Sequence, residues 1–279
     1  MNNFGEIFGA WFYEFWHFFW AIAPRWFSAW LVALLVLLFS FRGLKPKLRT
    51  RAMAFDGVMN TWARSLRYKL LQADAKLEPN TPPSERVLLT WFFRFWTNFA
   101  SAPSLSILAF VIPIWFFYRP LQQFVSANAF EVAQIAGSTS ELFAELGKDT
   151  FDATKIWLLP AFCYFGSMGL SYVLKRIFKR IRPPRDKGAF GHGLRDASFP
   201  SGHSLTAFCF WTGMIVSVTR ATSTPFAAIA FALIAIAIVL LTGLSRFYMA
   251  VHWPSDVAGG YIIGAVWTVI FLVACGGWF

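Results

Sequence analysis

The chain has 279 residues, of which 57% are hydrophobic, 19% aromatic and only 14% charged, and its 25 Lys and Arg against 14 Asp and Glu give a net charge of +11. Soluble domains carry about 25% charged residues, so this composition excludes an ordinary soluble protein, and the apolar content excludes a disordered chain. A basic excess is typical of nucleic-acid binding, but most aromatic residues here lie in long apolar blocks, so we expect a polytopic membrane protein with no nucleic-acid partner.

The N-terminal stretch Ile7–Ala23 is rich in Trp and Phe but includes Glu14 and His17. It has neither the basic start nor the small-residue cleavage site of a signal peptide. Aromatic, weakly charged segments favour the membrane interface. We therefore predict an interfacial helix that ends at Pro24, with a seventh membrane span as the alternative, and we expect His17 to be an interfacial polar residue without chemistry.

Six windows are apolar enough for membrane-spanning helices, which need about 20 mostly apolar residues when their flanks are included. They are Trp26–Phe41, Ser104–Tyr118, Ile156–Leu174, Ser204–Val218, Phe226–Leu244 and Val257–Ala274. The predicted fold class is therefore all-α, a polytopic membrane helical bundle with six transmembrane helices and additional interfacial amphipathic helices.

The polar stretch 42–103 contains a basic amphipathic helix pattern, typical of a helix on an anionic membrane surface. Its apolar residues recur at helical spacing, namely Phe55, Met59, Trp62, Leu66 and Leu70. We interpret this stretch as a surface-lying connector, with a substrate-gating role as the alternative. The predicted division of the chain is 1–103 for the N-terminal helix, first span and connector, and 104–279 for a catalytic membrane domain.

If the six spans alternate across the bilayer, the connectors 42–103, 175–203 and 245–256 share one face. Their net charges are +7, +6 and zero, so this face holds more than the whole basic excess. Two explanations stay open: retention of positive loops in the cytoplasm, and recruitment of anionic lipid head groups.

Three short motifs lie on this face, and their residue types suit phosphate chemistry. Arg offers a planar fork for phosphate oxygens and Lys a point charge. A helix start after Ser and Gly favours a bound anion, and a His beside a carboxylate is a candidate nucleophile. The motifs are Lys175-x6-Arg182-Pro183, Pro200-Ser201-Gly202-His203 and Ser245-Arg246-x5-His252-x3-Asp256.

With all three motifs complete, the sequence resembles the type 2 phosphatidic acid phosphatase superfamily over roughly residues 156–275, and its apolar spans suit the integral-membrane lipid phosphatase branch. The resemblance implies a helical core and catalysis without a metal or other cofactor. It also implies that His252 attacks phosphorus, that Asp256 orients His252, and that His203 protonates the leaving group and then activates water. The implied phosphate-binding residues are Lys175, Arg182, Ser201, Gly202 and Arg246.

The loop between the first two motifs holds candidate contacts to a second phosphate or head group, with a solvated loop as the default: His192, Arg185 and Arg195. The expected substrate and partner is a membrane lipid phosphate, with isoprenyl diphosphate carriers, phosphatidic acid, phosphatidylglycerol phosphate and phosphorylated glycolipids as candidates. A lipid phosphotransferase and a non-catalytic transporter or scaffold remain alternatives. The resemblance implies a bacterial cytoplasmic membrane and slightly favours an outward-facing site, whereas the positive-inside rule favours the cytoplasmic face.

Overall fold

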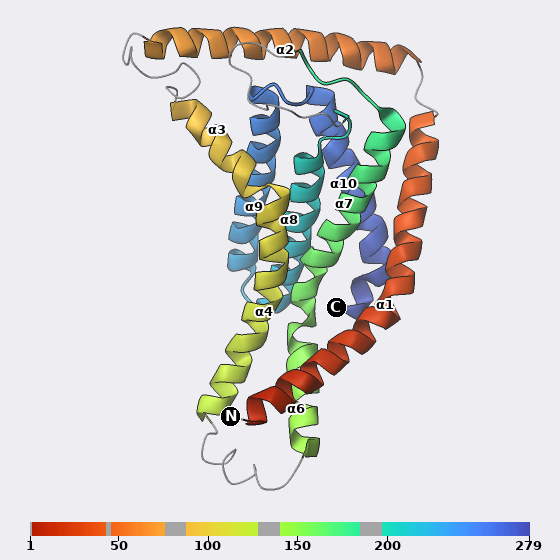
Figure 1. The fold of residues 1–279 in the computed structure, drawn as a ribbon, viewed down its shortest axis with the longest axis vertical. Helices are drawn as coiled ribbons and strands as arrows, with labels where there is room; N and C mark the ends of the chain where they lie inside the picture. The colour runs from red at the N-terminus through yellow and green to blue at the C-terminus, as the bar shows by residue number, and fades with distance from the viewer. Residues whose placement is uncertain (1, 43–45, 76–87, 128–139, 185–196) are drawn as a thin grey trace.

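The computed structural model describes residues 2–42, 46–75, 88–127, 140–184 and 197–279. Within these ranges the regular secondary structure is entirely helical, which confirms the predicted all-α class (Figure 1). The elements are α1 (Asn2–Arg42), α2 (Pro46–Ala75), α3 (Leu88–Phe99), α4 (Ala102–Ala127), α6 (Ser140–Thr154), a 3-10 turn (Lys155–Leu158), α7 (Leu159–Phe178), α8 (Gly202–Ala221), α9 (Pro225–Tyr248), α10 (Pro254–Cys275) and a final 3-10 turn (Gly276–Trp278).

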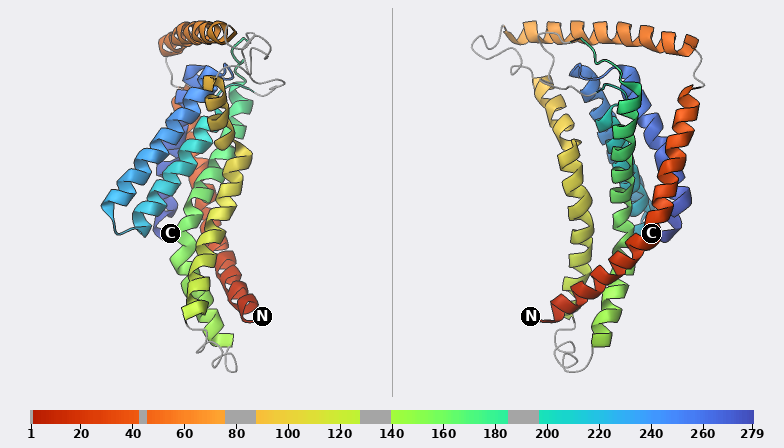
Figure 2. Two further views of the ribbon diagram at one scale, coloured as in Figure 1. Left: turned by 90° about the vertical axis from the view of Figure 1, so that its left-hand side faces the viewer. Right: turned by 45° about the vertical axis from the view of Figure 1, so that its right-hand side comes forward.

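The centre of the bundle is α8, which packs against α7, α9 and α10 (Figure 2). Large side chains fill the space between these helices, and the indole of Trp267 on α10 is fully buried. Its Nε1 donates a 2.8 Å hydrogen bond to the carbonyl of Cys163 on α7. The indole fits because α7 has glycine at position 166, where a Cβ atom would lie 2.1 Å from the ring. This close contact joins α7 and α10 beneath the end that carries the motifs.

The predicted number of six spans is not confirmed. Among the described residues four helices are long and apolar enough to cross a membrane, or five if α3 and α4 form one span bent by 48°. The difference lies in α8, which includes the predicted window Ser204–Val218 but does not qualify. Because neighbouring helices surround α8, polar residues such as Thr206 and Ser217 lie buried inside the bundle and not in lipid. The chain is nonetheless an integral membrane protein, because several of its helices are long and apolar enough to cross a membrane.

The prediction that an N-terminal helix ends at Pro24 is wrong. Helix α1 runs without interruption from Asn2 to Arg42 with Pro24 inside it, and its apolar part, Ile7–Phe41, is a single candidate span. Proline removes one helical hydrogen bond and usually bends a helix without always ending it. The first half of α1 slopes away from the second half (Figure 2) and packs against α6, while α1 also packs against α10. These contacts keep both halves helical.

Helix α2 lies across one end of the bundle, transverse to the spanning helices (Figure 1). Among its described side chains, those that it buries are Asp56, Asn60 and Ala63. The predicted apolar stripe is only partly covered by the bundle: Phe55 and Trp62 are more than half exposed, although Trp62 also stacks on Phe247 of α9. Helix α2 thus leaves apolar side chains available to a membrane surface. The division of the chain at residue 103 stays a prediction.

Candidate active site

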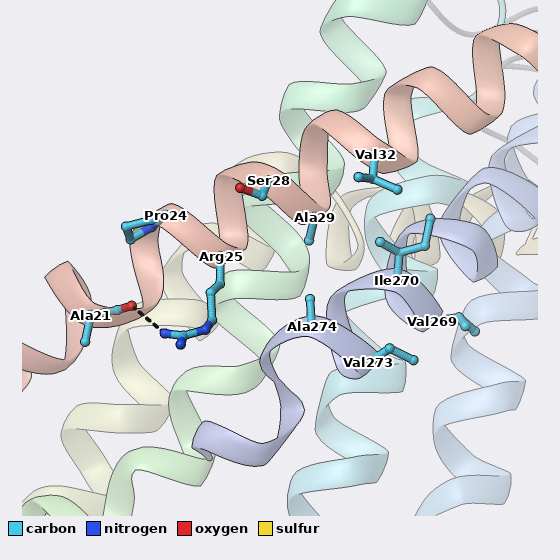
Figure 3. Close-up of a pocket in the computed structure, with 10 residues that line it drawn as sticks. All are labelled: Ala21, Pro24, Arg25, Ser28, Ala29, Val32, Val269, Ile270, Val273 and Ala274. Atoms are coloured by element: carbon cyan, nitrogen blue, oxygen red, sulfur yellow. Dashed lines mark hydrogen bonds between the residues drawn. The ribbon is translucent and has the colours of Figure 1, made fainter.

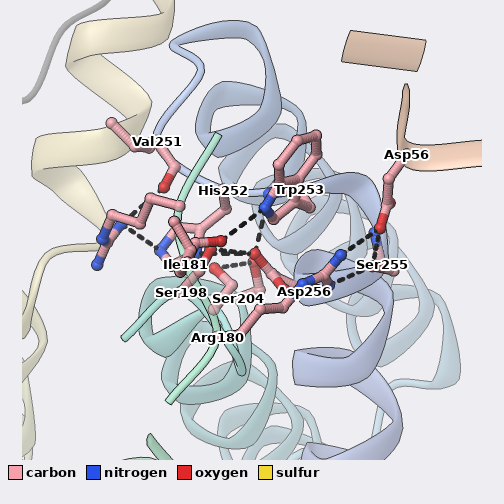
Figure 4. A network of polar contacts seen from close by, with 12 residues as sticks. Asp56, Arg180, Ile181, Ser198, Ser204, Val251, His252, Trp253, Ser255 and Asp256 are labelled. Carbon is pink, nitrogen blue, oxygen red and sulfur yellow. Dashed lines mark hydrogen bonds and ion pairs between the residues drawn. The ribbon is translucent and has the colours of Figure 1, made fainter. Parts of the chain in front are cut away.

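The three motifs meet at the end of the bundle that α2 covers (Figure 1). The first motif forms the last turn of α7 and the segment after it, and the second begins α8. The third forms the end of α9, the loop that follows and the start of α10. The close-up in Figure 4 shows the segment after α7 and the loop before α10 facing one another across a network of polar contacts. Residues distant in sequence thus form one candidate site.

His252 and Asp256 are both buried at the start of α10. Pro254 occupies the first turn of α10, where its missing N–H is not needed. Asp256 is therefore in the third helical position, and its Oδ2 accepts a 2.9 Å hydrogen bond from the backbone N–H of Trp253. The same oxygen lies 3.6 Å from Nδ1 of His252. This arrangement directs Nδ1 of the imidazole toward the carboxylate, so Nε2 faces away from the carboxylate.

Arg182 faces the Nε2 side of the imidazole. Its Nη1 donates a 2.6 Å hydrogen bond to the carbonyl of Val251 and lies 3.4 Å from Nε2 of His252. Burial lowers the pKa of His252 to about 4; the nearby carboxylate of Asp256 opposes this effect, and the charges of Arg246 and Arg182 reinforce it. His252 is therefore neutral near pH 7, which is the form that can act as a nucleophile.

His203 stands at the start of α8, ahead of the apolar window of that helix, and is partly exposed. Burial of its ring lowers its pKa well below the ordinary value, and the positive charge of Arg246 and the nearby His252 lower it further. Lys175 and Arg182 contribute in the same direction. The two histidines and the three basic residues of the motifs therefore lie within electrostatic reach of one another, as a phosphate site requires.

The start of α8 is held against α10. The backbone N–H of Ser201 donates a 3.0 Å hydrogen bond to the carbonyl of Asp256, and the hydroxyls of Ser201 and Ser204 lie 2.9 Å apart. The N–H of Ser201 is thus already used, so the N–H groups of the first helical turn, beginning at Gly202, are the ones suited to an anion. A Cβ atom on Gly202 would lie 3.3 Å from the hydroxyl of Ser171, so little room exists for a side chain.

Several residues in the network were not singled out by the sequence, among them Arg180, Asp56 and Ser198. Arg180 donates 2.6 Å hydrogen bonds to Asp256 and to Asp56 of α2, and the hydroxyl of Ser198 donates to the second oxygen of Asp256. Arg180 was one of several basic residues flanking the membrane, and Asp56 one of four acidic residues in the basic stretch 42–103, so neither carried a distinct signal. The candidate head-group contacts lie outside the described residues: His192, Arg185 and Arg195.

An apolar groove of about 860 Å³ lies away from this site, between α1 and α10 (Figure 3). Arg25 and Ser28 are its polar residues, and the rest of its lining is aliphatic. Within the described residues, no group of three or more His, Cys, Asp or Glu side chains could hold a metal ion. The groove has no histidine or carboxylate in its lining, unlike the site formed by the motifs.

Comparison with protein families matches residues 156–277 to a model described as the PAP2 superfamily. Among curated proteins, the chain is 33% identical to phosphatidylglycerophosphatase B of Bacillus subtilis over 137 residues, 47% of this chain and 64% of the relative. It is 36% identical to lipid A 1-phosphatase of Rhizobium johnstonii over 38% of this chain and 44% of the relative. It is 30% identical to decaprenylphosphoryl-5-phosphoribose phosphatase of Mycobacterium tuberculosis over 39% of this chain and 55% of the relative.

The chain thus spans less than two thirds of the length of each of these relatives. Among solved structures, it is similar to the crystal structure of a transmembrane PAP2 type phosphatidylglycerolphosphate phosphatase from Bacillus subtilis. The sequence identity is 22% and the TM-score 0.49, over 82% of this chain and 94% of that one.

Proposed function

Because residues 156–277 of the chain match the model of the PAP2 superfamily, we propose that this protein is an integral-membrane lipid phosphatase that acts through a phosphohistidine. The observation that carries the proposal is the placement of His252. It is buried, neutral near pH 7 and held between the carboxylate of Asp256 and the guanidinium of Arg182. A nucleophile, its orienting group and a phosphate-binding cation therefore occupy one site.

In the first step, Nε2 of His252 attacks phosphorus while the bond from phosphorus to the lipid oxygen breaks. The bound phosphate dianion raises the affinity of His203 for a proton, so His203 is protonated in the complex. It gives this proton to the departing oxygen, and a lipid alcohol, or a lipid phosphate when the substrate is a diphosphate, leaves. Arg182, Lys175 and Arg246 stabilise the negative charge on the equatorial phosphoryl oxygens. Asp256 stabilises the positive charge that develops on the ring of His252.

In the second step, a water molecule attacks the phosphohistidine. His203, now neutral, accepts a proton from that water, and the bond from phosphorus to Nε2 breaks. Inorganic phosphate leaves and His252 returns to its neutral form. The charges that stabilise both steps come from Arg and Lys side chains, so the reaction we propose needs no metal ion or other cofactor.

The substrate we propose is a phosphate ester or diphosphate on a membrane lipid. The names of the relatives indicate a phosphoglycerolipid, a glycolipid and a polyprenyl phosphate sugar, which share only a phosphate ester on a lipid. An isoprenyl diphosphate carrier, phosphatidic acid and phosphatidylglycerol phosphate are therefore the first substrates to test. Residues 104–279 would form the catalytic domain.

We further propose that the protein resides in a bacterial cytoplasmic membrane with its active site on the outer face. The positive-inside rule predicts the opposite, but it is weakest for connectors as long as 42–103, and several basic residues of this face serve the site. Labelling of a single cysteine introduced between residues 186 and 197 by an impermeant reagent tests the orientation. Labelling in intact cells supports an outer site, and labelling only after lysis contradicts it.

The central experiment measures phosphate release from a panel of purified lipid phosphates, with and without a chelator. We expect release from at least one lipid, undiminished by the chelator and abolished by His252→Ala. His17→Ala is the matched control, because His17 is exposed on α1 and distant from the motifs. The proposal is contradicted if phosphate is released from no lipid of the panel, or if His252→Ala retains full turnover. Transfer of labelled phosphate to an added lipid alcohol in place of release identifies a phosphotransferase instead.

A further inference from the structure

Asp56 is a buried carboxylate on a helix that otherwise lies on the surface. Only 1% of Asp56 is exposed, whereas its neighbours Phe55 and Gly57 are exposed. Burying a carboxylate is costly unless charges and hydrogen bonds compensate it. The partners of Asp56 therefore indicate why α2 carries an acid at this position.

Among the described residues, the hydrogen-bond partners of Asp56 are Arg180 and Ser255, which both belong to the polar network of the candidate active site. Its Oδ1 accepts a 2.9 Å hydrogen bond from the backbone N–H of Ser255. Its Oδ2 accepts a 2.5 Å bond from the hydroxyl of Ser255 and a 2.6 Å bond from Nη2 of Arg180 (Figure 4). Ser255 lies between His252 and Asp256 in sequence, so Asp56 fixes α2 directly to the segment that carries the nucleophile.

Arg180 connects Asp56 to the orienting carboxylate. Its Nη1 donates 2.6 Å hydrogen bonds to Oδ1 of Asp256 and to the hydroxyl of Ser255, while Nη2 bonds Asp56. The other oxygen of Asp256 faces Nδ1 of His252. One planar guanidinium therefore bridges two carboxylates and sets the orientation of the one that contacts the imidazole.

The charges of this cluster matter as much as its geometry. Arg180 carries one positive charge and the two carboxylates carry two negative charges, so the cluster keeps a net negative charge beside His252. When Nε2 of His252 bonds to phosphorus, its ring becomes positive, and a neighbouring negative charge stabilises that state more than the resting one. Without the charge of Asp56, Arg180 would neutralise Asp256 alone, and this stabilisation would weaken.

We propose that Asp56 is a positioning residue for catalysis: through Arg180 it holds Asp256, and thereby His252, in the reactive arrangement. The surface helix α2 is then a functional part of the active site as well as a membrane-surface element. The proposal rests on the proposed phosphatase function. It predicts a loss in the chemical step, not in the binding of the lipid, because Asp56 lies behind Asp256 on the side opposite Nε2.

The test compares Asp56→Asn with the wild-type protein in detergent micelles, using a lipid phosphate that the wild type hydrolyses. Asparagine keeps the shape and removes the charge. We expect kcat to fall about tenfold or more, the range expected for a misplaced catalytic group, with KM within about twofold. Removing a negative charge near His252 should also move the acid limb of kcat/KM to lower pH.

The matched control is Asp152→Asn on α6, at the opposite end of the molecule (Figure 1), where the carboxylate is 51% exposed and pairs with Lys155. It should match the wild type in kcat and KM. A kcat for Asp56→Asn within twofold of wild type overturns the proposal. So does a loss that merely follows the fraction of folded protein, measured by thermal unfolding and size-exclusion chromatography.

If Asp56→Asn does not fold, Ser255→Ala serves as the second variant, because it removes one hydroxyl between Asp56 and Arg180 without leaving a buried charge unpaired. We expect a kcat several-fold lower than wild type at unchanged KM, and an unchanged kcat overturns the proposal. A wild-type protein that hydrolyses no lipid phosphate refutes the proposed function itself. An active wild type with an equally active Asp56→Asn variant refutes only the role of Asp56.

Discussion

Nη1 of Arg182 lies 3.4 Å from Nε2 of His252 while it donates a hydrogen bond to the carbonyl of Val251. The guanidinium is thus held by the residue that precedes the nucleophile, so the two groups keep a constant separation. A phosphoryl group that approaches Nε2 meets the guanidinium at the same time. In the proposed reaction, Arg182 therefore binds the transferred oxygens in the transition state.

Replacing Arg182 with lysine keeps a positive charge but removes the planar fork. We expect kcat to fall about 10²-fold, the loss typical of one missing transition-state donor, because the ammonium lacks the planar fork of N–H groups that bonds the carbonyl and the phosphoryl group in one fixed geometry. Steady-state kinetics on the preferred lipid phosphate measure the change. Arg176→Lys is the matched control, since Arg176 is exposed and stacks on Tyr172 outside the network. Equal losses in both variants would refute a specific role for Arg182.

The pH dependence of kcat/KM should reflect the low pKa of His252, which burial lowers to about 4. The imidazole attacks only in its neutral form, so activity is lost as pH falls through that pKa, and kcat/KM reports the free enzyme. We expect the acid limb of kcat/KM to lie nearer pH 4 than pH 6.5 once the profile is corrected for ionisation of the substrate phosphate. Phosphorus NMR of the free substrate measures that ionisation.

The position of Arg246 gives this pH prediction an internal check. Its positive charge lowers the pKa of His252, so Arg246→Gln should move the acid limb to higher pH even though turnover also falls. A wild-type limb centred at pH 6.5, or a limb that moves to lower pH in the variant, would mean that His252 does not control the profile.

The role of His203 as a proton donor can be tested by changing the leaving group. Burial and the nearby cations lower the pKa of His203, so it is neutral in the free enzyme, and a bound phosphate dianion raises its affinity for a proton. For an alkyl phosphate, which leaves as a poor alkoxide, His203→Gln should reduce the phosphorylation rate about 10²- to 10⁴-fold.

For p-nitrophenyl phosphate the same variant should lose far less, because nitrophenolate leaves without a proton. Pre-steady-state bursts of leaving group isolate this step from hydrolysis of the phosphohistidine, which also uses His203. His17→Gln provides the matched control. An equal loss for both leaving groups would assign His203 to binding and not to proton transfer.

The sequence predicted the apolar helices and the motif residues because both depend on local patterns. Apolar windows such as Ile156–Leu174 and Val257–Ala274 lie within helices of the structure. The central helix α8 was harder to classify as a membrane span, because a helix surrounded by protein tolerates polar residues that would disqualify it in lipid. Continuity of α1 through Pro24 was also not predictable, since packing against α6 and α10 outweighs a local helix-breaking rule.

The support of the site depends on contacts that no local pattern encodes. Asp56 and Ser255 are 199 residues apart in sequence yet hydrogen-bonded. In the sequence, Asp56 is one acid in a basic amphipathic helix, which ordinarily indicates a solvated face. Only the placement of α2 across the end of the bundle brings it to Arg180. Motif residues can thus be recognised in the sequence, whereas the residues that hold them in place can be identified only from the structure.

The approach of α8 to α10 next to the site leads to a final prediction. Gly260 on α10 lies against the first turn of α8, where a Cβ atom would stand 2.9 Å from the carbonyl oxygen of Ser201, 3.1 Å from Cβ of Ser204 and 3.2 Å from the backbone nitrogen of Leu205. Two of these three atoms belong to the backbone, so a methyl group can be accommodated only by moving α8.

We therefore expect Gly260→Ala to displace Ser201 and the helix start that is suited to phosphate, reducing kcat/KM about 10²-fold and lowering the midpoint of thermal unfolding. Gly9→Ala is the control, because nothing lies within 4 Å of its Cβ position on α1, and alanine in a helix interior is neutral or slightly stabilising. Activity measured on the folded fraction separates displacement from unfolding. Full activity of folded Gly260→Ala would show that phosphate binding does not depend on the position of the first turn of α8.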